Sequence, residues 1–231
     1  MNWSLRTILA PLHPDGVKFV LAGVVATILL FLLWAPAGGL AAIATLWIAY
    51  FFRDPWRVTP TRAGLVISPA DGIVLSVSSA VPPPEVAASD AAVAKIDIFL
   101  NIFDVHVTRA PVGGKVTALR YSKGRFLNAS LDKASEENER LVIRIAPSEG
   151  PGVVFVQIAG LLARRIVCGL REGQQVGAGQ RIGIIRFGSR VDVYCPAPYV
   201  PMVAAGQRTV GGETVLADRI AQERPREGVA Q

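Results

Sequence analysis

The sequence predicts a mainly β protein of the α+β class, in which a compact β-rich domain follows an N-terminal hydrophobic helical hairpin. Two long runs without a charged residue occupy most of the first 52 positions. The remaining positions contain short segments in which apolar and polar residues alternate, which is typical of strands. Turns rich in glycine and proline separate these segments. We therefore expect a membrane-associated hairpin over residues 1–52 and a β-rich domain over residues 53–231.

The hairpin is predicted from two uncharged apolar runs, residues 19–35 and 37–52. As helices they would be about 24–26 Å long, near the lower limit for crossing a hydrocarbon core of about 30 Å. Residues 34–39, which include Pro36 and two glycines, are expected to form the turn. Basic residues flank both ends of the hairpin and none lies in its turn. The positive-inside rule therefore places both ends in the cytoplasm.

Three other interpretations compete with a hairpin that crosses the membrane. Residues 35–37 resemble a signal-peptide cleavage site, but the first run is longer than a usual signal-peptide core and a second apolar run follows. A buried core hairpin is disfavoured because neither run has a polar face. A hairpin that enters one leaflet without crossing fits two short runs as well as a spanning one.

Strands are expected where apolar and polar residues alternate, at residues 95–99, 141–145 and 191–194. Between such segments lie the turn signals, which are residues 69–72, 111–114, 148–152 and 177–179. Within the β-rich domain, helix is expected only over residues 131–140, with a short helical turn near residues 161–165. From residue 223 the polar sequence predicts a frayed tail.

Composition and charge exclude several classes of protein. Charged residues make up 18% of the 231 residues, against about 25% in an ordinary soluble domain, which excludes a disordered tail and a charged coiled coil. The two cysteines, Cys168 and Cys195, are too few for a disulfide scaffold and too far apart for a CxxC metal site. The net charge of +6 comes without a long basic run, which argues against nucleic-acid binding.

The chain contains two histidines. His13 lies beside prolines ahead of the hairpin, where an interfacial loop residue is expected. His106 lies in segment 103–111, on an expected strand with Asp104 and Thr108. A lone histidine on a strand is more often structural than catalytic. One usable histidine also argues against a catalytic zinc site, which needs three protein ligands.

Ser189 and Asp71 are the other candidates for chemistry. Ser189 follows Gly188, and a glycine before a serine tolerates strained backbone and leaves its own carbonyl accessible to the hydroxyl. Such a hydroxyl needs a base nearby to become a nucleophile. A Gly-Ser pair is also a common turn, and the GxSxG elbow of α/β-hydrolases is missing. On spacing alone Asp71 is an ordinary turn aspartate. Whether a β domain brings Asp71, His106 and Ser189 together is not shown by spacing.

Six motifs, in this order, make the chain resemble the short, bacterial and archaeal-type phosphatidylserine decarboxylase proenzymes. They are FFRDPWR (51–57), SPADG (68–72), FDVHVTRAP (103–111), NER (138–140), ARRIVC (163–168) and FGSR (187–190). The likeness extends from the apolar N-terminal region to about residue 215. Each motif is weak alone, but the combination is specific.

The resemblance implies a pyruvoyl-dependent decarboxylase made by autocatalytic serinolysis. Ser189 would attack the Gly188 carbonyl, and an ester would form by an N-to-O acyl shift. β-Elimination and hydrolysis would then give a large (β) chain of residues 1–188 and a small (α) chain of residues 189–231, which form a heterodimer. Ser189 would become a covalently bound pyruvoyl group, which forms a Schiff base with phosphatidylserine, releases CO2 and yields phosphatidylethanolamine. An electron sink of this kind is needed because no unmodified side chain provides one.

The resemblance also makes His106 the candidate general acid and base, with Asp71 either orienting it or supporting the cleavage step. In longer bacterial relatives this motif has two histidines, one assigned to maturation and one to decarboxylation. Here Arg109 occupies the second position. Either His106 serves both steps, or maturation depends on Asp71 and on strain at Gly188.

A lipid substrate implies a catalytic face at the membrane surface, on the cytoplasmic side of the cell (inner) membrane. Arg53, Arg57 and Arg62 would then contact anionic headgroups, at about 1 kcal/mol each, although arginines that only set topology explain the pattern too. Assembly of the heterodimer into a higher oligomer is compatible with this interpretation.

Two other classes remain open from the sequence. Residues 68–72 and 172–180 suggest a membrane-anchored lipoyl-like adaptor or carrier, but the turn that a carrier modifies has no lysine. A membrane serine hydrolase would use Ser189, His106 and Asp71 without self-cleavage. Cleavage before Ser189 distinguishes the decarboxylase from both.

Overall fold

The computed structural model describes residues 10–86, 90–124, 138–160, 165–186 and 189–221. The chain divides into two units, Met1–Trp56 and Arg57–Gln231. Most of the helix predicted over residues 131–140 lies outside the described residues, as do residues 161–164 and the tail after residue 221. The last part of that helix prediction is wrong, because Asn138 forms a β-bridge and Arg140 begins a strand.

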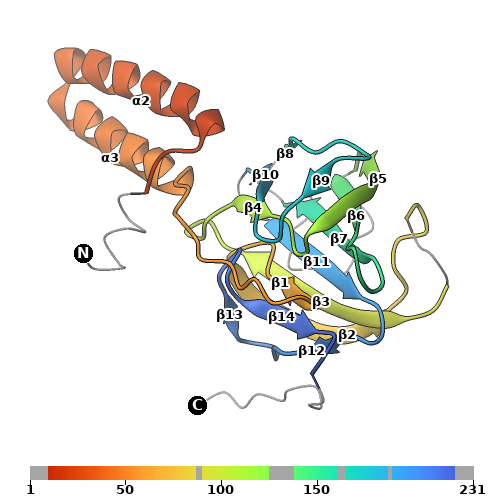
Figure 1. Cartoon of the computed structure of the whole chain (residues 1–231). Helices are drawn as coiled ribbons and strands as arrows, with labels where there is room; N and C mark the ends of the chain where they lie inside the picture. Colours follow the sequence, from red (N-terminus) through yellow and green to blue (C-terminus); the bar gives the residue numbers. More distant parts are fainter. Residues whose placement is uncertain (1–9, 87–89, 125–137, 161–164, 187–188, 222–231) are drawn as a thin grey trace. The chain divides into compact units, whose positions relative to one another are not determined.

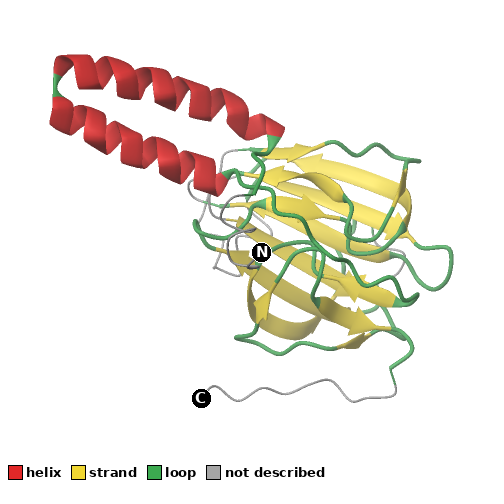
Figure 2. Ribbon diagram, turned by 60° about the vertical axis from the view of Figure 1, so that its left-hand side comes forward, coloured by secondary structure: helices red, strands yellow, loops and turns green. Residues whose placement is uncertain are grey.

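The first unit is a hairpin of two helices, α2 (Pro14–Leu33) and α3 (Ala35–Phe51), which run antiparallel side by side (Figure 2). The predicted turn over residues 34–39 is too long, because only Trp34 separates the helices. Pro36 lies in the first turn of α3, where its missing N–H would have no helical partner in any case and its fixed φ suits the helix. Proline therefore starts the second helix here.

Small residues let the two helices approach closely. A Cβ added at Gly23 would lie 2.6 Å from the Thr45 hydroxyl oxygen, and the Thr27 and Thr45 hydroxyls form a hydrogen bond of 3.2 Å. Glycine contacts and hydroxyl pairs of this kind are typical of helices packed in a membrane. At the open end of the hairpin, the His13 N–H donates to the Phe52 carbonyl over 2.8 Å.

Helix α2 is long and apolar enough to cross a membrane, and α3 is a shorter apolar helix. Many of their large apolar side chains are exposed, Leu32 and Leu33 by about four-fifths. Apolar surface exposed to this extent is typical of a site that contacts a membrane or another protein.

The second unit consists of β-strands that, within the described residues, form three antiparallel sheets (Figure 1). The largest sheet contains, side by side, β13 (Arg208–Thr209), β2 (Gly72–Ala80), β3 (Val93–Leu100), β11 (Ser189–Cys195), β7 (Val153–Ala159), β6 (Arg140–Ala146), β5 (Gly114–Ser122) and β9 (Gln175–Val176). The second sheet contains β4 (Val107–Arg109), β10 (Arg181–Ile185) and β8 (Ile166–Cys168). The third contains β1 (Leu65–Ile67), β14 (Val215–Asp218) and β12 (Val200–Pro201). The strands predicted at residues 95–99, 141–145 and 191–194 are confirmed as parts of β3, β6 and β11.

The central strands are buried on both faces of the large sheet. Val191 and Val193 of β11 belong to the main apolar core, whereas Tyr194 packs in a second apolar cluster with Val156 and Ile158 of β7. Since successive side chains of a strand point to opposite faces, these two clusters cover the two sides of the sheet. Ser189 lies two positions before Val191 on the same strand, so its side chain points to the same face of the sheet, toward the main core.

Candidate active site

Five neighbouring strands of the large sheet begin or end along the same boundary of the sheet. We call this line of strand ends the edge that holds the site. Ser189 begins β11 and pairs with Leu100, the last residue of β3, and with Ala159, the last residue of β7. Strand β2 begins beside them at Gly72, and β6 begins at Arg140. This edge therefore brings together residues of four of the six motifs, SPADG, FDVHVTRAP, NER and FGSR.

The Ser189 hydroxyl lies in the interior without a hydrogen-bond partner among the described residues. Ser189 is fully buried and its Oγ is unpaired. Leaving a buried hydroxyl unpaired costs on the order of 1–3 kcal/mol, and such groups in native structures call for an explanation. No other described residue therefore holds the Ser189 hydroxyl in a hydrogen bond.

Gln157 is a second buried polar group on the same face, and the sequence prediction missed it. Its Nε2 donates to the Thr108 hydroxyl over 2.9 Å, while its Oε1 has no partner among the described residues. Gln157 pairs with Val191, two positions along the strand from Ser189. The signal was present in the sequence, because Gln157 is the one polar residue in the otherwise apolar run of β7.

His106 is fully buried and lies directly before β4, whereas the sequence placed it on the strand. Its Nδ1 lies 3.0 Å from the Asp104 carbonyl oxygen. A carbonyl can only accept, so Nδ1 donates the hydrogen and the lone pair of the neutral ring is on Nε2. The His106 carbonyl accepts from the Ile185 N–H over 3.1 Å. A backbone hydrogen bond thus joins His106 to the end of β10, which precedes Ser189 in the sequence.

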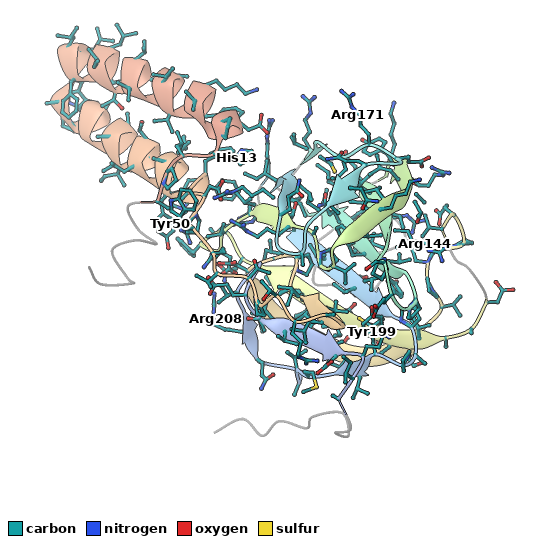
Figure 3. The ribbon with its side chains drawn as sticks, viewed as in Figure 1. His13, Tyr50, Arg144, Arg171, Tyr199 and Arg208 are labelled. Atoms are coloured by element: carbon teal, nitrogen blue, oxygen red, sulfur yellow. The ribbon has the colours of Figure 1, made fainter. Side chains whose placement is uncertain are left out.

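The loop before His106 is itself fixed by contacts of the buried Asp104 side chain. Asp104 accepts a hydrogen bond from the Asn101 N–H over 2.9 Å and forms an ion pair of 2.5 Å with Arg208. Arg208 extends from β13 (Figure 3), which is an outermost strand of the large sheet and lies two strands from β3. The Asp104 carbonyl that holds the His106 ring therefore belongs to an ordered loop.

Asp71 lies in the bend before β2, held by contacts that the sequence did not predict. Its carboxylate forms an ion pair of 2.7 Å with Arg57 and accepts from the Gly211 N–H over 2.7 Å. Gly72 and Ser189 are two strands apart in the sheet, which at strand spacing corresponds to about 10 Å. Asp71 thus lies at the same edge as Ser189, where Arg57 and Gly211 contact its carboxylate.

The three arginines expected at lipid headgroups have hydrogen-bond or ion-pair partners within the protein. Arg53 is buried and donates to the Tyr50 carbonyl, and Arg57 is half-buried and paired with Asp71. Only Arg62 of the three has a largely exposed side chain, and it pairs with Asp218. Arg109, at the position where longer relatives have a histidine, is buried and donates to the Gly179 carbonyl over 3.0 Å.

In the part of the chain that the structure describes, His, Cys, Asp and Glu do not gather in groups of three that could hold a metal ion. The arrangement offers instead an unpaired buried hydroxyl, an oriented imidazole and a fixed carboxylate. These groups suit acyl transfer and proton transfer.

Comparison with known proteins gives a consistent result. Residues 44–217 match the model of a family described as phosphatidylserine decarboxylase. A phosphatidylserine decarboxylase proenzyme of Cereibacter sphaeroides is 50% identical over 227 residues, covering 98% of each chain. Proenzymes with the same name from Paramagnetospirillum magneticum and Saccharopolyspora erythraea are 52% and 53% identical, covering 94% and 92% of this chain and 91% and 90% of their own.

These matches define the chain as a lyase of the decarboxylase class. It belongs to the phosphatidylserine decarboxylase family, as the six motifs predicted. Family membership disagrees with the adaptor and hydrolase alternatives.

Proposed function

We propose that the chain is the precursor of a pyruvoyl-dependent phosphatidylserine decarboxylase that cleaves itself between Gly188 and Ser189. The observation that supports it most is the unpaired Ser189 hydroxyl, fully buried at the edge where the motifs meet. An internal serine nucleophile needs a base to take its proton, and the unpaired Ser189 hydroxyl has no competing partner among the described residues.

Maturation uses the chain's own atoms. The Ser189 Oγ attacks the Gly188 carbonyl, the peptide C–N bond breaks, and an ester joins the two residues. Removal of the Ser189 α-proton then breaks the Cβ–Oγ bond, so that residues 1–188 leave with a new carboxylate. Water hydrolyses the dehydroalanine left at position 189, ammonia departs, and a pyruvoyl group remains at the start of the small chain (residues 189–231).

His106 serves as general base and acid. Asp71 holds the neighbouring chain segments in place at the same edge of the sheet. Nδ1 keeps its hydrogen and donates it to the Asp104 carbonyl in both protonation states, so Nε2 is the nitrogen that gains and loses a proton. Asp71 of the large chain holds Gly211 of the small chain through its carboxylate. It therefore acts by positioning, and the orientation of the His106 ring rests on Asp104.

The pyruvoyl group would supply a carbonyl that condenses with the amine of phosphatidylserine and accepts the electrons released with CO2. Position 189 suits such a group, because it is fully buried and has Leu100 and Ala159 as strand neighbours. The buried position would keep bulk water away from the reacting atoms, and a proton on His106 Nε2 would provide the acid that completes phosphatidylethanolamine.

The apolar hairpin gives this enzyme access to its lipid substrate. Helices α2 and α3 bring the chain to the membrane, and the basic flanks of the hairpin place the catalytic unit on the cytoplasmic side. The heterodimer of large and small chains is the functional unit.

Ser189→Ala tests the function. Full-length protein in detergent micelles should remain a single chain and release no CO2 from carboxyl-labelled phosphatidylserine, because the nucleophile is lost. Ser78→Ala is the matched control, since Ser78 lies exposed on β2, and it should be cleaved and active. Normal cleavage of Ser189→Ala would refute the assignment.

A further inference from the structure

We propose that Arg190 is a positioning residue, whose buried ion pairs with Asp97 and Asp192 keep residue 189 seated in the sheet after the chain before it has been cut. The proposal rests on the proposed function. It concerns the step that follows cleavage, when residue 189 becomes a chain end.

Four charged residues form a compact group on the face of the sheet opposite the Ser189 side chain. Arg190 Nη2 lies 2.8 Å from Asp97 Oδ2, and Arg190 Nε lies 2.5 Å from Asp192 Oδ1. Lys95 Nζ lies 3.0 Å from Asp97 Oδ1 and 3.1 Å from Asp192 Oδ2. Arg190 is 1% exposed and Asp192 is fully buried. The group is electrically balanced, with two cations and two anions.

The pairing register of β3 and β11 explains why two basic residues accompany the two aspartates. Asp192 of β11 lies directly opposite Asp97 of β3, and like charges opposite each other destabilise a sheet. Burial and the Asp97 charge together raise the pKa of Asp192 to about 6. Arg190 and Lys95 lie diagonally on either side of this pair and bridge both carboxylates. The two strands therefore fit together in one register only.

A one-residue slip of β11 would turn every side chain to the other face. Arg190 and Asp192 would then enter the apolar core, and Val191 and Val193 would leave it. Buried ion pairs are weak contributors to stability, and their best-supported use is to specify register. Here they fix residue 189 opposite Leu100 and Ala159.

Cleavage makes this network an inter-chain contact. Lys95 and Asp97 belong to the large chain, whereas Arg190 and Asp192 belong to the small chain. Two of the pairs, Arg190–Asp97 and Lys95–Asp192, therefore join the chains. Before cleavage residue 189 is held by covalent bonds on both sides. Afterwards the N-terminal bond is gone, and Arg190 is the first side chain that anchors the new chain end.

The experiment compares Arg190→Met, Arg190→Lys and Asp97→Asn with Arg120→Met, all as full-length protein in detergent. Arg120 also pairs with a carboxylate, Glu172, but on an exposed surface. For each protein we would measure the cleaved fraction, the reactive carbonyl content of the small chain, and kcat and KM per carbonyl on phosphatidylserine in mixed micelles.

In cleaved Arg190→Met, we expect kcat per carbonyl to fall about 10- to 100-fold, the loss that a misplacement of about 1 Å can cause. KM should stay within about twofold, Arg190→Lys should recover part of the loss, and Arg120→Met should match the wild type. A role in folding alone would lower the yield of cleaved protein but leave kcat per carbonyl unchanged.

If Arg190→Met gives no folded protein, Arg190→Lys and Asp97→Asn are measured in the same way, since both keep the side-chain volume nearly unchanged. Unchanged kcat per carbonyl in the cleaved variants would overturn the proposal and leave the proposed function intact. Folded variants that are not cleaved would assign Arg190 to maturation and overturn it as well. A wild-type chain that stays whole and has no carbonyl would be the failure of the proposed function itself.

Discussion

The strand that leads into Ser189 contains a glycine whose replacement should be costly. Gly183 lies in β10 between β4 and β8, where it pairs with Thr108 and Cys168. A Cβ at this position would lie 1.9 Å from the Val167 carbonyl oxygen and 2.9 Å from its carbon. Both are backbone atoms, so neither can move aside as a side chain would.

The magnitude for Gly183→Ala follows from that contact. Real Cβ atoms essentially never approach another heavy atom to less than 3.0 Å, so β10 and β8 must separate by roughly 1 Å. Overpacking of this kind costs about 1–3 kcal/mol, and the rigid backbone contact places Gly183→Ala at the upper end. A loss of about 3 kcal/mol lowers the melting temperature of a domain of this size by roughly 6–12 °C.

The displacement should also affect maturation, because Ile185 of the same strand donates to the His106 carbonyl. The assay is thermal unfolding in detergent, together with the cleaved fraction on a denaturing gel. Gly169→Ala is the control, since its nearest atom is the Ile182 carbonyl oxygen at 3.9 Å, an ordinary contact. A melting temperature for Gly183→Ala equal to that of Gly169→Ala would refute the reasoning.

Two further substitutions test buried polar groups. Gln157→Leu should lower the free energy of unfolding by no more than about 3 kcal/mol, because the buried Thr108 hydroxyl loses its partner while the unpaired Oε1 is removed; a denaturant titration showing a larger loss would contradict this. Asp192→Asn should flatten the pH dependence of stability. Burial and Asp97 raise the pKa of Asp192 to about 6, so the folded wild type binds one more proton than the unfolded chain between about pH 4 and 6. As the pH rises to 7 this proton is lost, and the wild type loses up to about 3 kcal/mol of stability relative to Asp192→Asn. A constant difference between the two proteins from pH 4 to 7 would exclude that shift.

The sequence was sufficient for features that depend on local pattern. Period-two alternation located β6 at residues 141–145, and the uncharged runs located both hairpin helices. The pattern failed at Pro36, because a proline signals both the end of one helix and the first turn of the next. It also failed at Arg140, whose conformation is decided by strand pairing with β7 and β5.

The candidate site could be named from the sequence but not assembled from it. Ser189, His106 and Asp71 were found from motifs, whereas their partners depend on which strands are neighbours. The Asp104 carbonyl, Arg57 and the Gly211 N–H could not be predicted, because each contact crosses a loop or joins distant segments. Alternation in β11 also failed to reveal that Arg190 and Asp192 are buried, because a polar residue on a strand is ordinarily a solvent-facing one.

The most direct test of the central claim is the intact mass of the purified wild-type protein. Self-cleavage predicts two chains, residues 1–188 with a free carboxylate and residues 189–231 with a blocked N-terminus. The small chain should also be lighter than a serine-initiated chain, because a pyruvoyl group replaces Ser189. A single full-length mass in protein that decarboxylates phosphatidylserine, or a small chain that begins with an intact serine, would contradict the account.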